Sequence, residues 1–191
     1  MRRRFVLALV ALALAGGAAG CSAGHNAVDA DSGGGNRYVS GDGKTVRYAE
    51  GERPAAPKVS GPTLDGSSFD LASAQGSVVV LNFWAQWCAP CRSEAADLEA
   101  VYQATAPQGV LFVGVNSRDV KDQALAFQKA HATYPSLFDP TGRISLGFND
   151  LNVTLPSTVV IDRHGKIAAV VRDAVVQNDL TTLVRAVAAE T

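Results

Sequence analysis

Two cysteines three positions apart are the most reactive feature of this 191-residue chain. Residues 78–91 read VVVLNFWAQWCAPC, which places Cys88 and Cys91 directly after a long apolar run. Such a pair allows three kinds of chemistry: a structural disulfide, half of a metal site, or a dithiol that cycles between reduced and oxidised states.

The composition favours redox cycling. A structural zinc site usually needs four Cys or His ligands, and the available set would be Cys88, Cys91, His131 and His164, whose histidines lie far along the chain. A disulfide that closes so small a loop restricts the unfolded chain little, so it would add little stability. We therefore expect no metal site, and a dithiol that reacts by thiol-disulfide exchange.

The residues around the pair predict how it is held. Residues 78–85 form a continuous apolar, β-branched run, typical of a strand buried on both faces. Apolar residues then recur at helical spacing from Pro90 to about Thr105. This predicts Cys88 at the N-cap of a helix, where free N–H groups favour a thiolate, and Cys91 one turn inside. We expect Cys88 to attack and Cys91 to resolve the mixed disulfide, with Trp84 and Trp87 supplying apolar surface beside them.

The other elements alternate along the chain. We expect a hairpin over 58–71 with its turn at Asp65-Gly66, a strand over 109–117, a helix over 119–132 and a short strand over 136–138. A second hairpin over 155–171 and a closing helix over 178–189 follow. The alternation predicts an α/β sheet covered by helices.

The N-terminus predicts export. Arg2 to Arg4, an apolar run and small residues directly before Cys21 are typical of a secretory signal over residues 1–20, and of a lipobox that leaves Cys21 as a lipidated first residue. A plain secretory signal with an incidental cysteine is the alternative. Arg3 to Val6 also loosely fits a twin-arginine signal.

Residues 21–54 predict a flexible tether, because Gly, Ser, Asp, Asn and Ala dominate there. A short hairpin around Gly41-Asp42-Gly43 is compatible with this composition. Residues 55–191 suit one domain. Without the three arginines of the signal, 14 basic side chains face 18 acidic ones, which does not favour binding to nucleic acid.

The motifs LNFWAQ-WCAPC and LPSTVVIDRHGKI resemble those of thioredoxin-fold proteins, and in particular the exported TlpA, ResA and CcmG group of thiol-disulfide oxidoreductases. The resemblance covers residues 55–191. It implies a thioredoxin-like α/β fold with an N-terminal β-hairpin, a central α/β insert over 119–138, and no cofactor beyond the dithiol.

The resemblance also implies further site residues. Pro156 would be the cis-proline beside the dithiol, with the backbone of Leu155 free to pair with an extended substrate; an ordinary trans proline at a strand start is the alternative. Independently of the resemblance, we expect Trp87 and Trp84 to serve packing as much as contact with the substrate. Asn82 stands where thioredoxin has an acid. Glu94 would exchange protons with Cys91, whereas a solvated acid at a helix N-terminus is the alternative.

Members of this group typically receive electrons from a membrane thiol transporter of the CcdA or DsbD type and reduce apocytochrome c before haem attachment. The resemblance implies the same protein partners here, at the membrane through a lipid anchor on Cys21. A general oxidase that forms disulfides in exported proteins is the main alternative. A peroxiredoxin-like peroxidase and a metallochaperone are two others.

Overall fold

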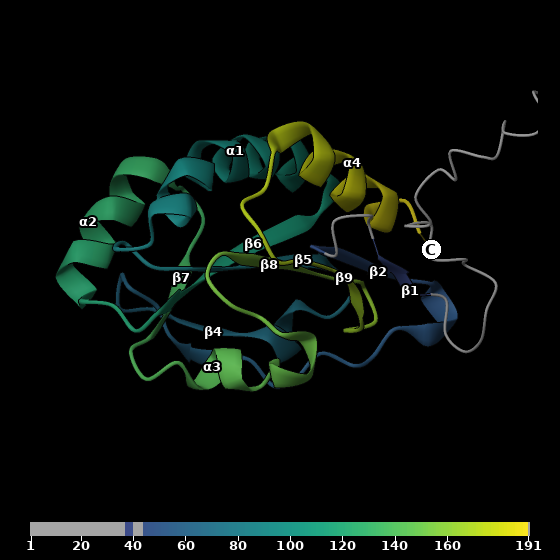
Figure 1. The fold of residues 1–191 in the computed structure, drawn as a ribbon, viewed down its shortest axis with the longest axis horizontal. Coiled ribbons are helices and arrows are strands. Elements are labelled where there is room, and N and C mark those ends of the chain that lie inside the picture. Colours follow the sequence, from purple (N-terminus) through teal and green to yellow (C-terminus); the bar gives the residue numbers. More distant parts are fainter. Residues whose placement is uncertain (1–36, 40–43, 191) are drawn as a thin grey trace, which may run out of the picture.

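The computed structural model describes residues 37–39 and 44–190. Within them, seven strands form one sheet in the order β1-β2-β9-β8-β5-β6-β7, and β3 and β4 form a separate hairpin (Figure 1). Strands β5, β6 and β7 run parallel to one another, whereas β8, β9, β2 and β1 continue the sheet in antiparallel pairs. The predicted α/β architecture is confirmed.

The bounds of the elements follow the predicted alternation. The strands are β1 (Arg37–Val39), β2 (Thr45–Tyr48), β3 (Ser60–Pro62), β4 (Ser68–Asp70), β5 (Val78–Trp84), β6 (Val110–Ser117), β7 (Ser136–Asp139), β8 (Ser157–Ile161) and β9 (Ile167–Val171). The α-helices are α1 (Ala89–Thr105), α2 (Lys121–His131), α3 (Arg143–Leu146) and α4 (Gln177–Ala188). Short 3-10 turns lie at Glu50–Glu52, Leu71–Ala74, Ala106–Gln108 and Asn149–Leu151.

The sheet is buried on both faces. Helices α1 and α4 cover one face, and the β3-β4 hairpin and α3 lie on the opposite side (Figure 1). Side chains alternate along β5, so that Val78 and Val80 pack in the core under the helices while Val79, Leu81 and Phe83 pack in the other. This explains why all seven residues of β5 are buried and why its sequence is continuously apolar.

The expected tether over residues 21–54 is wrong for its last part. Strand β2 pairs with β9, and the side chain of Val46 on it is buried. The side chain of Arg53 is 6% exposed and forms ion pairs with Asp162 and Glu190. Burial of a few well-placed residues at a sheet edge therefore adds this segment to the domain, although its overall composition is polar. The expected hairpin between β1 and β2 is confirmed, and residues 1–36 lie outside the described part of the chain.

The connection between β7 and β8 was not foreseen. It contains α3 and the turn Asn149–Leu151. Phe148 of this connection packs in the core against Phe83, with 5.2 Å between the ring centroids. Asp139 starts this connection by accepting hydrogen bonds from the N–H groups of Arg143 and Ile144. In the described residues, no helix is both long and apolar enough to span a bilayer.

Candidate active site

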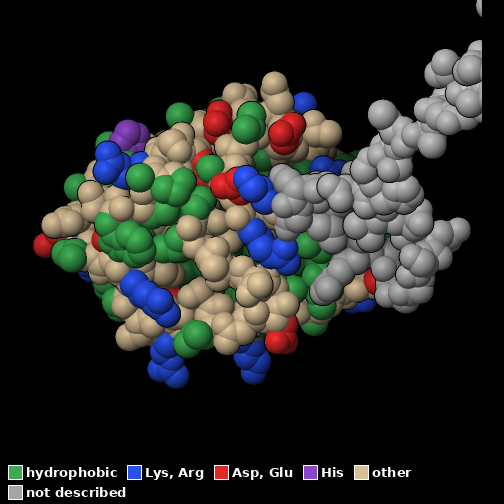
Figure 2. Space-filling view, viewed as in Figure 1, with side chains coloured by type: hydrophobic (Ala, Val, Ile, Leu, Met, Phe, Trp, Pro, Cys, Tyr) green, Lys and Arg blue, Asp and Glu red, His purple; other side chains and the backbone are tan. Residues whose placement is uncertain are grey.

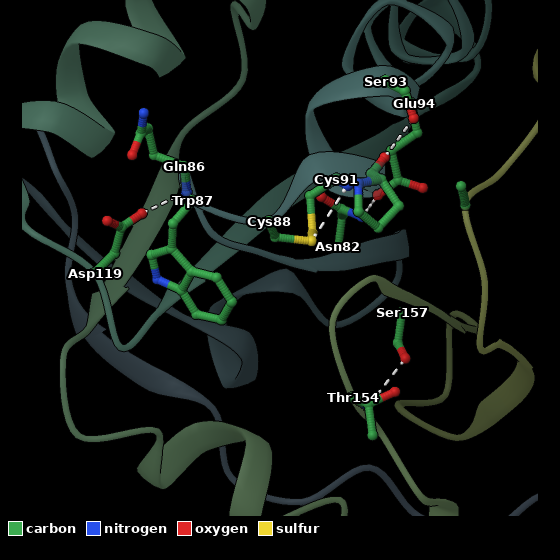
Figure 3. The surroundings of a disulfide bond; sticks show 12 residues. Asn82, Gln86, Trp87, Cys88, Cys91, Ser93, Glu94, Asp119, Thr154 and Ser157 are labelled. Carbon is green, nitrogen blue, oxygen red and sulfur yellow. Dashed lines mark hydrogen bonds between the residues drawn. A yellow bond between two sulfur atoms is a disulfide. The ribbon is translucent and has the colours of Figure 1, made fainter.

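Cys88 is the N-cap residue of α1, as the sequence predicts. Its Sγ accepts a hydrogen bond from the N–H of Cys91 at 3.3 Å, and the two sulfurs are joined in a disulfide (Figure 3). Pro90 lies in the first turn, where a helix needs no N–H donor. In the reduced protein, the same N–H groups and the positive end of the helix would stabilise a Cys88 thiolate.

Both sulfur-bearing residues are largely covered. Cys88 and Cys91 are 6% and 3% exposed, and they share a small apolar cluster with Trp84 and Ala85 from the end of β5. Cys91 lies on the inner side of α1. Cys88 lies at the end of the helix and Cys91 one turn further in, which is the arrangement that an attacking and a resolving cysteine require.

Glu94 is buried, so the alternative of a solvated acid is wrong. Its side chain is 1% exposed, and its two oxygens accept hydrogen bonds from Nδ2 of Asn82 at 2.9 Å and from the N–H of Val175 at 2.8 Å. Burial raises the pKa of Glu94 to about 7, although the two hydrogen bonds oppose this shift. Nearby negative charge on Asp173 and Asp97 adds to the increase in pKa.

A pKa near neutrality suits a group that takes up and releases protons at physiological pH. Glu94 lies three residues after Cys91, on the same buried side of α1. Asn82 supports it from β5 and also donates to Oγ1 of Thr158 on β8, at 3.3 Å. The carboxyl group is therefore fixed against the centre of the sheet rather than mobile at the surface.

The loop before β8 faces the disulfide. Figure 3 shows Thr154 and Ser157, which flank Leu155 and Pro156, across from the two cysteines. The Leu155–Pro156 peptide bond is cis, as the resemblance implies, and the side chain of Leu155 packs against the cluster that holds Cys88 and Cys91. No hydrogen bond joins the N–H or C=O of Leu155 to another residue of the described chain.

The two tryptophans differ in their surroundings. Trp84 is buried and donates from Nε1 to Oγ of Ser136. Trp87 is 58% exposed, and its Nε1 donates to the carbonyl oxygen of Arg118 at 3.0 Å. Only Trp87 can therefore offer apolar surface to a partner.

Asp119 is a site residue that sequence reasoning missed. One carboxylate oxygen accepts hydrogen bonds from the N–H of Gln86, at 2.5 Å, and from Nδ2 of Asn116, at 2.9 Å (Figure 3). Together with the Trp87–Arg118 contact, this fixes the loop that carries Cys88. The signal was present in the sequence, because Asp119 follows a strand parallel to β5, and the carboxyl ends of parallel strands meet at one edge of the sheet.

Cys21, the expected lipidation site, lies outside the described residues. His131 and His164 are exposed. Among residues 37–39 and 44–190, no group of three or more His, Cys, Asp or Glu side chains comes close enough together to hold a metal ion.

Comparison with known proteins agrees with this geometry. Residues 53–170 match the model of the AhpC/TSA family. The thioredoxin-like protein YneN of Bacillus subtilis is 35% identical over 135 residues, which are 69% of this chain and 76% of YneN. The thiol-disulfide oxidoreductase ResA of Bacillus subtilis is 34% identical over 56% of this chain and 59% of its own length.

A solved structure is also similar. The secreted thiol-disulfide isomerase of Corynebacterium glutamicum matches with a TM-score of 0.70 and 34% identity, over 82% of this chain and 100% of its own.

Proposed function

The chain belongs to the AhpC/TSA family and is a thiol-disulfide oxidoreductase with a thioredoxin-like fold, and we propose that it acts outside the cytoplasm as a reductant of protein disulfides. The observation that carries the exchange chemistry is the position of Cys88 at the N-cap of α1, with Cys91 and the buried Glu94 directly behind it. This arrangement supports an attacking thiolate at Cys88, at the end of the helix, and a resolving thiol at Cys91, on the inner side of α1.

The reaction starts from the reduced dithiol. The thiolate of Cys88 attacks one sulfur of a substrate disulfide, the substrate S–S bond breaks, and the second substrate cysteine leaves as a thiolate that takes up a proton. A mixed disulfide then links Cys88 to the substrate. The unpaired peptide group of Leu155, beside Pro156, supports strand-like pairing with the bound substrate segment.

Cys91 completes the exchange. Its thiol gives a proton to the carboxylate of Glu94, and the resulting thiolate attacks Sγ of Cys88. The bond between Cys88 and the substrate breaks, and the substrate sulfur that Cys88 first attacked leaves as a thiolate and takes up a proton. The substrate gains two electrons and two protons, and the Cys88–Cys91 disulfide remains. A pKa of about 7 lets Glu94 accept this proton near neutral pH and release it afterwards.

The biological substrate we propose is the disulfide of apocytochrome c, with electrons supplied by a membrane thiol transporter of the CcdA or DsbD type. The similarity to a secreted isomerase supports a location outside the cytoplasm, and the similarity to the thiol-disulfide oxidoreductase ResA supports exchange with protein disulfides. A lipid on Cys21 and the polar segment after it would hold the domain near both partners at the membrane, which raises their effective concentration.

Deletion of the gene tests whether apocytochrome c is the substrate in the cell. The deletion should lower covalently bound c-type cytochromes, and an added small-molecule thiol should restore them. Normal cytochromes together with missing disulfides in exported proteins would instead favour the general oxidase.

Replacement of Cys21 tests the anchor. Cys21→Ala should move the protein from the membrane fraction to the soluble extracytoplasmic fraction without a change in its activity on a soluble disulfide. Retention in the membrane would contradict lipidation of Cys21.

A further inference from the structure

A groove of about 380 Å³ lies next to the active-site loop. Three segments far apart in the sequence form its walls: the residue before Cys88, the end of β6, and the connection from α3 to the cis-proline. Trp87, Leu146 and Leu155 give it apolar surface, and Trp87 and Leu146 are both more than half exposed. Figure 2 shows that hydrophobic side chains gather on the left half of the face that it draws, with Lys and Arg side chains below them.

Hydrogen bonds within the protein hold the walls of the groove in place without a ligand. The carbonyl of Arg118 accepts the indole N–H of Trp87, so the ring is held in place although it is exposed. The N–H of Arg118 donates to the carbonyl of Asp139, which ties the same residue to the start of the α3 connection. A preformed groove with an exposed aromatic anchor is typical of a binding surface.

Arg118 is the one charged residue among the described residues that line the groove. It is exposed, and no carboxylate of the described chain lies within 4 Å of its guanidinium group. A Cβ on Gly142 would come within 2.7 Å of Nε of Arg118, so the missing side chain at position 142 makes room for this arginine.

Asp119 follows Arg118 in the sequence and Asp139 accepts its N–H through the backbone, and the carboxylates of both already have other partners. Asp119 accepts hydrogen bonds from Gln86 and Asn116, and Asp139 accepts them from the backbone at the start of α3. The positive charge of Arg118 is therefore available to a ligand.

Ser117 provides a second, independent observation. It lines the same groove and is 3% exposed, and its hydroxyl has no hydrogen-bond partner in the described structure. Buried polar groups are nearly always paired, so an unused hydroxyl in the wall of a groove points to a partner that arrives with a ligand. A hydroxyl donor beside a guanidinium group matches a carboxylate.

We propose that the groove binds an extended segment of the substrate protein that carries an aspartate or glutamate close to its reactive disulfide. The carboxylate lies at Arg118 and Ser117, and an apolar residue contacts Trp87 and Leu146. This proposal rests on the proposed thiol-disulfide exchange at Cys88 and adds to it the chemistry of the preferred substrate.

Two cystine-bridged peptides test the preference. They share an apolar residue and differ only in a glutamate or a lysine beside the disulfide. With the reduced full-length protein at low salt, the rate constant for the glutamate peptide should exceed that for the lysine peptide by about tenfold, and the ratio should shrink as salt increases. Arg118→Gln should bring the ratio close to one, Arg118→Glu should invert it, and Arg118→Lys should keep most of it.

Matched variants separate charge from structure. Arg143→Gln removes an exposed arginine on α3 that does not line the groove, and it should leave the ratio unchanged. Ser117→Ala should slow only the glutamate peptide, by about threefold. The rate with a neutral small-molecule disulfide is measured for every variant and divides its peptide rates; for Arg143→Gln this rate should equal that of the wild-type protein. If wild-type protein reduces both peptides equally or prefers lysine, the inference is overturned; if it reduces neither the peptides nor the small disulfide, the proposed function itself fails.

Discussion

The Nδ2 atom of Asn82 donates a hydrogen bond to Oε1 of Glu94 over 2.9 Å, which joins the only fully buried acid of α1 to the central strand beside the disulfide (Figure 3). The other carboxyl oxygen accepts the N–H of Val175, before α4. Glu94 is thus fixed from two sides in an environment that keeps its pKa near 7. A thioredoxin-type acid would stand on the strand at position 82; here the strand supplies the amide and the helix supplies the acid.

Glu94→Gln should change the pH dependence of exchange. In the wild-type protein, the rate at which Cys91 resolves a mixed disulfide should rise with pH through about 7, as Glu94 becomes a carboxylate. The variant should lose this inflection and react about 100-fold more slowly near pH 7. Stopped-flow measurement of resolution between pH 5 and 9 checks this, with Glu99→Gln on the same helix as the control. A wild-type profile in the Glu94→Gln protein would contradict a proton-transfer role.

The raised pKa of Glu94 should also make folding stability depend on pH. Below about pH 4.5 the group is neutral in both the folded and unfolded protein; as pH rises to about 7, it ionises only in the unfolded protein. The free energy of unfolding of the oxidised protein should therefore fall over this range by roughly 2–4 kcal/mol relative to Glu94→Gln. Denaturant titrations of both proteins measure the difference, and a difference that does not vary with pH would rule out the shift.

The two cysteines should behave differently when each is replaced. Cys91→Ser leaves Cys88 able to attack but removes the resolving thiol, so mixed disulfides with substrate proteins should accumulate in cells. Cys88→Ser should trap almost nothing, because Cys91 lies inside α1, on its buried side, rather than at the end of the helix. Non-reducing gels of affinity-purified protein count the trapped species. Equal trapping by both variants would reverse the assignment.

Replacement of the buried Trp84 and of the exposed Trp87 should have different effects on stability and on activity. Trp84→Ala should cost about 3–5 kcal/mol of stability, because it empties a buried site. Trp87→Ala should cost less than about 1 kcal/mol but lower the rate with a protein disulfide while a small disulfide reacts normally. Chemical denaturation and exchange kinetics measure the two effects. Normal rates with protein substrates in Trp87→Ala would remove this residue from the binding surface.

Much of the site can be predicted from the sequence alone, because the residue patterns that indicate it lie within short stretches of the chain. The apolar run of β5 followed by helical spacing predicts the N-cap position of Cys88, and the structure confirms it. The cis peptide bond at Pro156 agrees with what the family resemblance implies. In both cases a short stretch contains the whole signal.

What could not be predicted depends on contacts between distant residues. The burial of Glu94 rests on Val175, 81 residues away, and helix periodicity cannot reveal such a partner. The same holds for Asp119, whose carboxylate meets the N–H of Gln86, 33 residues earlier. The segment from Asp139 to Leu155 has no strong periodicity, yet it forms one wall of the groove through Leu146 and Leu155.

The reduction potential of the Cys88–Cys91 pair tests the central claim most directly. A protein that reduces disulfides in an oxidising compartment must hold electrons at a lower potential than its substrates, so equilibration against a glutathione or thioredoxin couple should give about −270 mV, similar to thioredoxin. The transition should vanish in Cys91→Ser. A value near −120 mV, typical of a strong oxidant, would contradict the reductant and identify a protein that forms disulfides instead.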